Sequence, residues 1–223
     1  MSVFREDDVT DDANRMFTGF NPSKHLLSKD KSAPTVDVFV LGLAHTYGDH
    51  RQIALLFGVK FEDCSKRAKK IHVYREFKSG LTMGPPEIAK GIIAMINDVA
   101  TSVGLHPLAF VKKLTCYGNN NAENSGNLRL YNTRIEEALA ALEYEIVINT
   151  PKDFVGVRPE CEALINAIAI ADGLTANPKC ELLTYKLQNH QCGTVDPVVD
   201  ALRYGLYESL SASIKHSSQL YRG

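Results

Sequence analysis

The sequence predicts an α+β fold: a small sheet of scattered strands packed with several helices and preceded by an N-terminal arm. Apolar runs typical of strands and apolar repeats typical of helices both occur along the 223 residues, and they do not alternate regularly. Strands that are few and unequally spaced favour α+β over a doubly wound parallel sheet. We expect a single domain over residues 35–223 and a flexible or subunit-exchanging arm over residues 1–34.

The arm is predicted from its composition. Its first dozen residues are strongly acidic, and the remainder is rich in glycine, proline, serine and lysine. Such a segment buries too little apolar surface to offset the entropy lost when it becomes ordered. It can remain a flexible tail, or it can become ordered on a neighbouring subunit. In the second case the residues that anchor self-association are Phe17, Phe20, Leu26 and Leu27.

Three elements are predicted in the first part of the domain. Residues 36–44 form a β-rich apolar run bounded by Pro34 and Gly48, which predicts a buried strand. Residues 52–57 predict a short helix that ends near Gly58. Residues 71–77 alternate apolar and polar side chains, as a half-buried strand does.

Helices dominate the predicted middle of the chain. Pro85, Pro86 and Glu87 open a helix whose apolar spacing continues to residue 99 and whose end is predicted near Gly104. Pro107 opens a second helix over residues 107–117, followed by a loop.

The C-terminal part combines helices and strands. A capping box over residues 133–136 starts a helix, residues 144–149 predict a strand, and residues 159–172 predict an apolar helix. Residues 181–188 are predicted as a strand. The final helix starts at residues 196–197 and places these apolar side chains on one face: Val198, Val199, Leu202, Leu206 and Leu210.

Bulk composition limits the possible functions. The net charge of −1 argues against a generally basic nucleic-acid-binding protein. Five widely spaced cysteines do not form the pattern of a disulfide framework. The N-terminus lacks the basic start and apolar centre of a signal peptide, and no apolar run approaches the ~20 residues that span a bilayer. We therefore expect an intracellular protein that is not secreted and has no transmembrane segment.

A basic cluster stands out in this nearly neutral chain. Lys66, Arg67, Lys69 and Lys70 follow one another with only Ala68 between them. The cluster can be a solvated loop, a nuclear-import signal, or a contact for the phosphates of nucleic acid or anionic lipid. Lys112 and Lys113 form a second basic pair.

Two groups of residues have metal-ligand chemistry. His45, Asp49 and His50 could surround zinc or iron, but no distant third ligand accompanies them. Zinc modules bring cysteines in close pairs, and the group of Cys180, His190 and Cys192 contains no such pair. A nucleophile elbow and a phosphate-binding loop are also missing from the sequence. We therefore predict no metal, no cofactor and no enzymatic activity.

Residues 71–120 resemble the matrix proteins of rhabdoviruses. The matching pattern is a strand over residues 71–74, an apolar helix over residues 87–103, Gly104, and the segment from Phe110 to Asn120. A later strand over residues 145–148 also has a place in that fold. The N-terminal arm departs from the family because it is acidic and lacks a Pro-Pro-x-Tyr motif. A plant-infecting, nucleus-replicating relative would account for the import-like basic cluster.

The resemblance implies a non-enzymatic viral structural protein that self-assembles and links a ribonucleoprotein to a membrane. Its partners would be further copies of itself, a ribonucleoprotein, an anionic membrane surface and a nuclear import receptor. It would be found in the virion and in the host cytoplasm or nucleus. Lys66, Arg67, Lys69 and Lys70 would make the main contacts, with Lys112 and Lys113 as secondary contacts. The alternatives are an RNA-binding nucleocapsid or coat protein, a small cytosolic enzyme with a site at residues 45–50, and a cellular adaptor.

Overall fold

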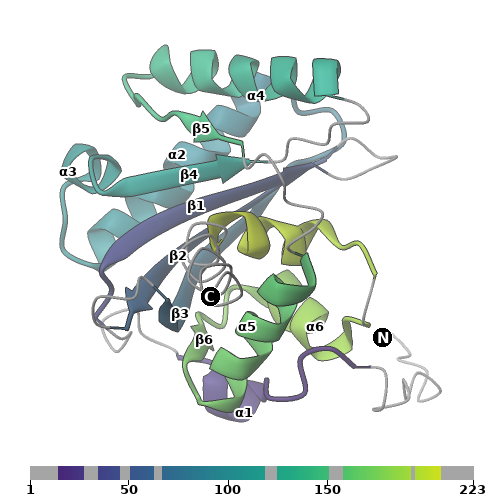
Figure 1. Ribbon diagram of the computed structural model, residues 1–223. Coiled ribbons are helices and arrows are strands. Elements are labelled where there is room, and N and C mark those ends of the chain that lie inside the picture. The colour runs from purple at the N-terminus through teal and green to yellow at the C-terminus, as the bar shows by residue number, and fades with distance from the viewer. Residues whose placement is uncertain are drawn as a thin grey trace, which may run out of the picture.

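The computed structural model describes residues 15–27, 35–45, 51–62, 67–118, 125–150, 158–191 and 194–206. They form a mixed sheet with helices on both faces, which confirms the predicted α+β class (Figure 1). The strands are β1 (Val38–His45), β2 (Gln52–Phe61), β3 (Ala68–Lys78), β4 (Leu114–Gly118), β5 (Ile148–Asn149) and β6 (Leu174–Ala176). The helices are α1 (Pro22–His25), α2 (Pro85–Ser102), α3 (Pro107–Val111), α4 (Ser125–Ala140), α5 (Arg158–Ile170), α6 (Glu181–Asn189) and a further helix over residues 197–206.

The six strands lie in the order β5-β4-β1-β2-β3-β6. The first three form an antiparallel meander, in which Leu41 of β1 is opposite Leu56 of β2. β4 then pairs in parallel with the other edge of β1, β5 pairs in parallel with β4, and β6 pairs in parallel with β3. Because β1 and β4 are parallel, their carboxyl ends meet at the same end of the sheet.

Each face of the sheet supports its own apolar core. Leu41 and Leu43 of β1 point into the core shared with α2, α3 and α4. Val40 and Ala44 of the same strand point into the core shared with α5, α6 and the 197–206 helix. A central strand that is buried on both faces is apolar along its whole length, as the sequence of β1 is.

The 197–206 helix (yellow in Figure 1) lies in direct contact with β1. A Cβ atom added at Gly42 would lie only 1.9 Å from the carbonyl oxygen of Ala201. A Cβ atom added at Gly205 would lie 2.5 Å from Cγ1 of Val40. Residue numbers therefore rise along the helix as they fall along β1. The helix runs antiparallel to β1, and its N-terminal turn lies toward the carboxyl ends of β1 and β4.

The described part of the predicted arm packs on the core shared with α5, α6 and the 197–206 helix. Phe17 and Phe20 are buried there, and the backbone nitrogen of Leu27 donates to the carbonyl oxygen of Ala176 in β6 at 2.9 Å. These two phenylalanines are used inside the chain's own core, so in this arrangement their side chains are not available to a neighbouring subunit. Residues 1–14 and 28–34 lie outside the described residues.

Five predicted elements were wrong in type or extent. The predicted 144–149 strand is only Ile148–Asn149, and the helix predicted to start at residues 133–136 begins at Ser125. Residues 52–57 form β2 instead of a helix, because this strand is buried on both faces and shows no alternation. The predicted 107–117 helix ends at Val111, and residues 114–118 form β4. Residues 181–188 form α6 instead of a strand, with Leu183 and Leu187 one helical turn apart in the core.

None of the helices in the described residues is both long and apolar enough to span a bilayer.

The contact between β1 and the 197–206 helix makes a testable prediction. We expect Gly42→Ala to lower the free energy of unfolding by roughly 1–3 kcal/mol, because its new methyl group must push the helix backbone away from the sheet. Gly80→Ala is the matched control, since its Cβ atom would lie 3.8 Å from Cγ of Met83, an ordinary contact distance. Urea unfolding of both variants measures the difference, and equal stability would contradict the close approach.

Candidate functional site

The predicted basic residues lie at the end of the sheet where β1 and β4 begin. Arg67, Lys69 and Lys70 are exposed at the start of β3, whereas Lys66 lies outside the described residues. Lys70 is in register with Lys60 of β2, whose ammonium group lies 3.0 Å from the carboxylate of Asp37. Lys112 and Lys113 are exposed just before β4, and Leu114 is in register with Phe39 near the start of β1. The topology therefore brings both predicted basic groups to one end of the sheet, and their role as contacts stays a prediction.

The predicted group at residues 45–50 is only partly described. His45 ends β1, and its ring packs edge-on against Tyr131 with the ring centroids 5.0 Å apart. Asp49 and His50 lie outside the described residues. Within the described ranges there is no group of three or more histidine, cysteine, aspartate or glutamate side chains arranged to hold a metal ion.

The second group considered from the sequence does not come together as a ligand set. Cys180 is buried at the start of α6, with Sγ 3.8 Å from the carbonyl oxygen of Val73, and Cys192 lies outside the described residues. His190 is buried and belongs instead to a polar network. The thiol of Cys161 is also a poor nucleophile, because burial raises its pKa to about 12.

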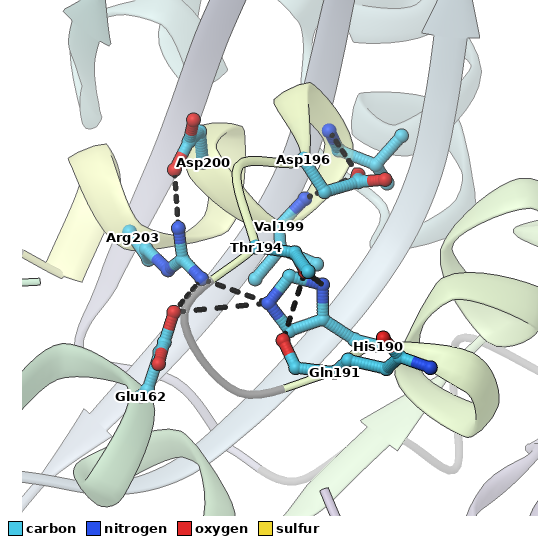
Figure 2. A network of polar contacts seen from close by, with 9 residues as sticks. Glu162, His190, Gln191, Thr194, Asp196, Val199, Asp200 and Arg203 are labelled. Atoms are coloured by element: carbon cyan, nitrogen blue, oxygen red, sulfur yellow. Dashed lines mark hydrogen bonds and ion pairs between the residues drawn. The ribbon is translucent and has the colours of Figure 1, made fainter. Parts of the chain in front are cut away.

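That network is the most prominent charged feature in the protein interior (Figure 2). We call it the buried polar cluster, and its members are Glu162 of α5, His190 at the end of α6, and Asp200 and Arg203 of the 197–206 helix. All four are at most 5% exposed, and Arg203 is fully buried. Nη1 of Arg203 donates to Oδ1 of Asp200 at 2.5 Å, and Nη2 donates to Oε1 of Glu162. The same Nη2 lies 3.0 Å from Nε2 of His190.

Arg203 determines the tautomer of His190, and burial together with Arg203 lowers its pKa. A guanidinium has no acceptor, so Nε2 of His190 must accept and the ring proton of a neutral histidine must lie on Nδ1. Nδ1 then donates to Oγ1 of Thr194 at 3.3 Å, and that hydroxyl donates to the carbonyl oxygen of Gln191 at 2.8 Å. Burial and the charge of Arg203 both lower the pKa of His190. His190 is therefore neutral and links the cluster to Phe17, whose ring stacks on it at 5.6 Å.

A third carboxylate lies one helical turn before the cluster. Asp196 accepts from the backbone nitrogens of Val198 at 2.9 Å and Val199 at 3.3 Å, as an N-cap residue does. Its other oxygen lies 2.8 Å from the ammonium group of Lys186. The side chain of Asp196 is 11% exposed and that of Lys186 is 34% exposed, so this pair lies closer to the surface than the cluster does.

The described part of the sheet beneath this end of the helix carries no acidic side chain. Gly42, Ala44 and Tyr117 occupy the described positions of β1 and β4 on this face. Among the six strands the one acidic residue is Glu76 of β3. Its carboxylate accepts from the backbone nitrogens of Leu182 and Leu183 at 2.8 Å, and burial raises its pKa. Glu76 therefore caps α6.

Comparison with known proteins shows what this arrangement is similar to. No family model and no curated protein matches the sequence. The nuclease domain of the large terminase of phage P22 has the same fold, with a TM-score of 0.51 and 13% identity over 86% of this chain and 90% of that one. The nuclease domain of the large terminase of bacteriophage SPP1 with bound Mn matches with a TM-score of 0.51 and 13% identity, over 82% of this chain and 92% of that one. At this identity the shared property is the fold, which is of the ribonuclease H type.

These structures correct the function predicted from the sequence. The resemblance to rhabdovirus matrix proteins was wrong, because the structures that this chain is similar to in fold are terminase nuclease domains. The predictions of a non-enzymatic matrix protein and of ribonucleoprotein and membrane partners were wrong on the same finding. The resemblance rested on common residue types in a strand, a helix and a loop, and many α+β folds contain that local sequence of elements.

The state of His190 predicts how stability depends on pH. Its pKa in the folded chain lies below the ordinary value of 6.5, so the unfolded chain takes up this proton at a higher pH than the folded chain does. The contribution of His190 to stability is therefore complete above about pH 6.5 and is lost as the pH falls toward the folded-state pKa.

We expect the melting temperature of the His190→Gln variant to fall less steeply than that of the wild type between pH 7 and pH 5. Glutamine keeps an acceptor for Arg203 but has no titrating ring. His106→Gln, at an exposed histidine before α3, is the control for the exchange of a histidine for a glutamine. Identical slopes for the wild type and His190→Gln would show that His190 does not titrate as described.

Proposed function

We propose that this chain is a DNA-processing domain of the viral terminase nuclease type, which binds duplex DNA and cuts its phosphodiester backbone. The observation that carries the proposal is the fold shared with the P22 and SPP1 nuclease domains over more than four fifths of the chain. Such a domain would act in viral DNA packaging, whereas a matrix protein links a ribonucleoprotein to a membrane. The proposal agrees with one alternative drawn from the sequence, a small cytosolic enzyme, only in that both are enzymes. That alternative placed the site at residues 45–50 and did not include the buried polar cluster.

The carboxyl ends of β1 and β4 are the part of the sheet best suited to such chemistry. The meander and the parallel strand β4 bring two chain segments side by side there, and the 197–206 helix adds Asp196 from above. The side chain of Asp196 is more exposed than those of Glu162 and Asp200, and its partner Lys186 is a described cation beside it. An ammonium group at this position can contact a DNA phosphate while Asp196 keeps its bonds to the helix nitrogens.

A bound divalent ion, as in the SPP1 domain, does not fit the described residues of this chain. Glu162 and Asp200 are already paired with Arg203, and Asp196 is paired with Lys186. Gly42, Ala44 and Tyr117 offer no carboxylate from the sheet. A divalent ion would need ligands from outside the described ranges, and we derive no catalytic step through it.

The basic end of the sheet fits a role in DNA binding. Lys69, Lys70, Lys112 and Lys113 are exposed there, at the opposite end of β1 from Asp196. Exposed lysines neutralise phosphates and release counterions, which makes binding depend on salt. We therefore propose that the basic residues predicted from the sequence contact the DNA backbone away from the site of cleavage.

Charge reversal tests the basic contacts. The variant Lys69→Glu, Lys70→Glu, Lys112→Glu, Lys113→Glu should bind a duplex oligonucleotide at least tenfold more weakly at 50 mM salt, with a shallower salt dependence, because up to four phosphate contacts are lost. Reversal of Lys90 and Lys179, which are exposed on other parts of the surface, is the control and should weaken binding much less. Fluorescence anisotropy measures both variants. Equal losses would show that the lysines act through total charge alone.

Cleavage is tested on supercoiled and linear duplex DNA with added Mg²⁺ or Mn²⁺ and with a chelator. We expect the full chain to nick or cut the DNA, and we expect Asp196→Asn to lower the rate by roughly 100-fold while it still binds DNA, because Asp196 positions the ammonium group of Lys186. Asp37→Asn, at the basic end of the sheet, is the control and should cut at the wild-type rate. A chain that binds DNA but leaves it intact under every condition would contradict the cutting step, and a chain that does not bind DNA would contradict the whole proposal.

A further inference from the structure

The buried polar cluster has the composition of a cation site, and its cation is part of the chain. Two carboxylates and one imidazole nitrogen, contributed by α5, the end of α6 and the 197–206 helix, converge on the guanidinium of Arg203 (Figure 2). Figure 2 shows the side chains of Glu162, His190 and Asp200 arranged around it on different sides. These are donor types that also bind divalent transition metals.

The carboxylates require a positive charge at this position. Glu162 and Asp200 are 5% and 4% exposed, and a buried carboxylate is strongly destabilising unless it is paired. Either a metal ion or a side chain can supply the charge. The guanidinium stays protonated in proteins and presents its N–H groups in a fixed fork, so it satisfies carboxylates on two sides at once.

The same arrangement excludes a second cation. Oδ1 of Asp200 and Oε1 of Glu162 are both directed at the guanidinium, and they bind different nitrogen atoms of it. The lone pair on Nε2 of His190, which a metal would need, accepts from Nη2 of Arg203. A divalent ion placed among these atoms would lie against a permanent positive charge that cannot serve as a ligand.

We propose that Arg203 takes the place of a divalent ion in this cluster, so that Glu162, Asp200 and His190 bind the guanidinium and no metal. The arginine then fastens the 197–206 helix to α5 and α6, as a structural metal would. This assignment holds whether or not the chain cuts DNA.

Counting bound Mn²⁺ by electron paramagnetic resonance tests the assignment, with the full-length chain in every sample. The triple variant Glu162→Gln, Asp200→Asn, Arg203→Met removes all three charges but keeps the side-chain volumes, so we expect it to fold. It should bind as many Mn²⁺ ions as the wild type, because any ion that the wild type holds lies elsewhere. Loss of one ion in the triple variant would overturn the proposal.

The single variant Arg203→Ala tests the role of the guanidinium directly. We expect it to melt at a lower temperature than the wild type and than the triple variant, because Glu162 and Asp200 are then buried without their cation. An Arg203→Ala variant as stable as the wild type would overturn the proposal, and if this variant does not fold, the comparison of the triple variant with the wild type decides.

Discussion

The backbone contact between β1 and the 197–206 helix is the constraint on which the rest of the structure depends. Gly42 and Gly205 allow this contact, because a side chain at either position would collide with the opposite element. The contact places Asp196 over the carboxyl ends of β1 and β4, and it buries Asp200 and Arg203 against α5 and α6. Once two carboxylates are buried there, a cation must accompany them. The position of the helix thus leads directly to the charge pattern of the site.

Much of the fold was predictable from local patterns, and the errors have a common physical cause. The strand at residues 36–44, the helix that starts at Pro85 and the helix that starts at Asp196 all carry signals in their own sequence. β2 does not, because burial on both faces removes the alternation that identifies a strand. The strand order depends on pairings such as Phe39 with Leu114 that local sequence does not specify.

The site was harder to predict than the fold. Asp196, Asp200 and Arg203 follow each other at helical spacing, so their position on one side of a helix could have been noticed. Their partners could not, because Glu162 lies 41 residues and His190 lies 13 residues from Arg203 in the sequence. His190 was singled out for its ligand chemistry, but as a companion of two cysteines. In the structure the partner of His190 is the guanidinium of Arg203. Nε2 of His190 therefore accepts a hydrogen bond from an arginine instead of binding a metal.

The fold and the buried charges therefore give different information about function. The fold is similar to that of terminase nuclease domains, whereas the buried polar cluster holds an arginine between its two carboxylates. The measurement that tests this claim most directly is an anomalous difference map from crystals grown with Mn²⁺. We expect guanidinium density between Glu162 and Asp200 and no manganese peak there. A manganese peak bonded to both carboxylates, with Arg203 displaced, would contradict the account.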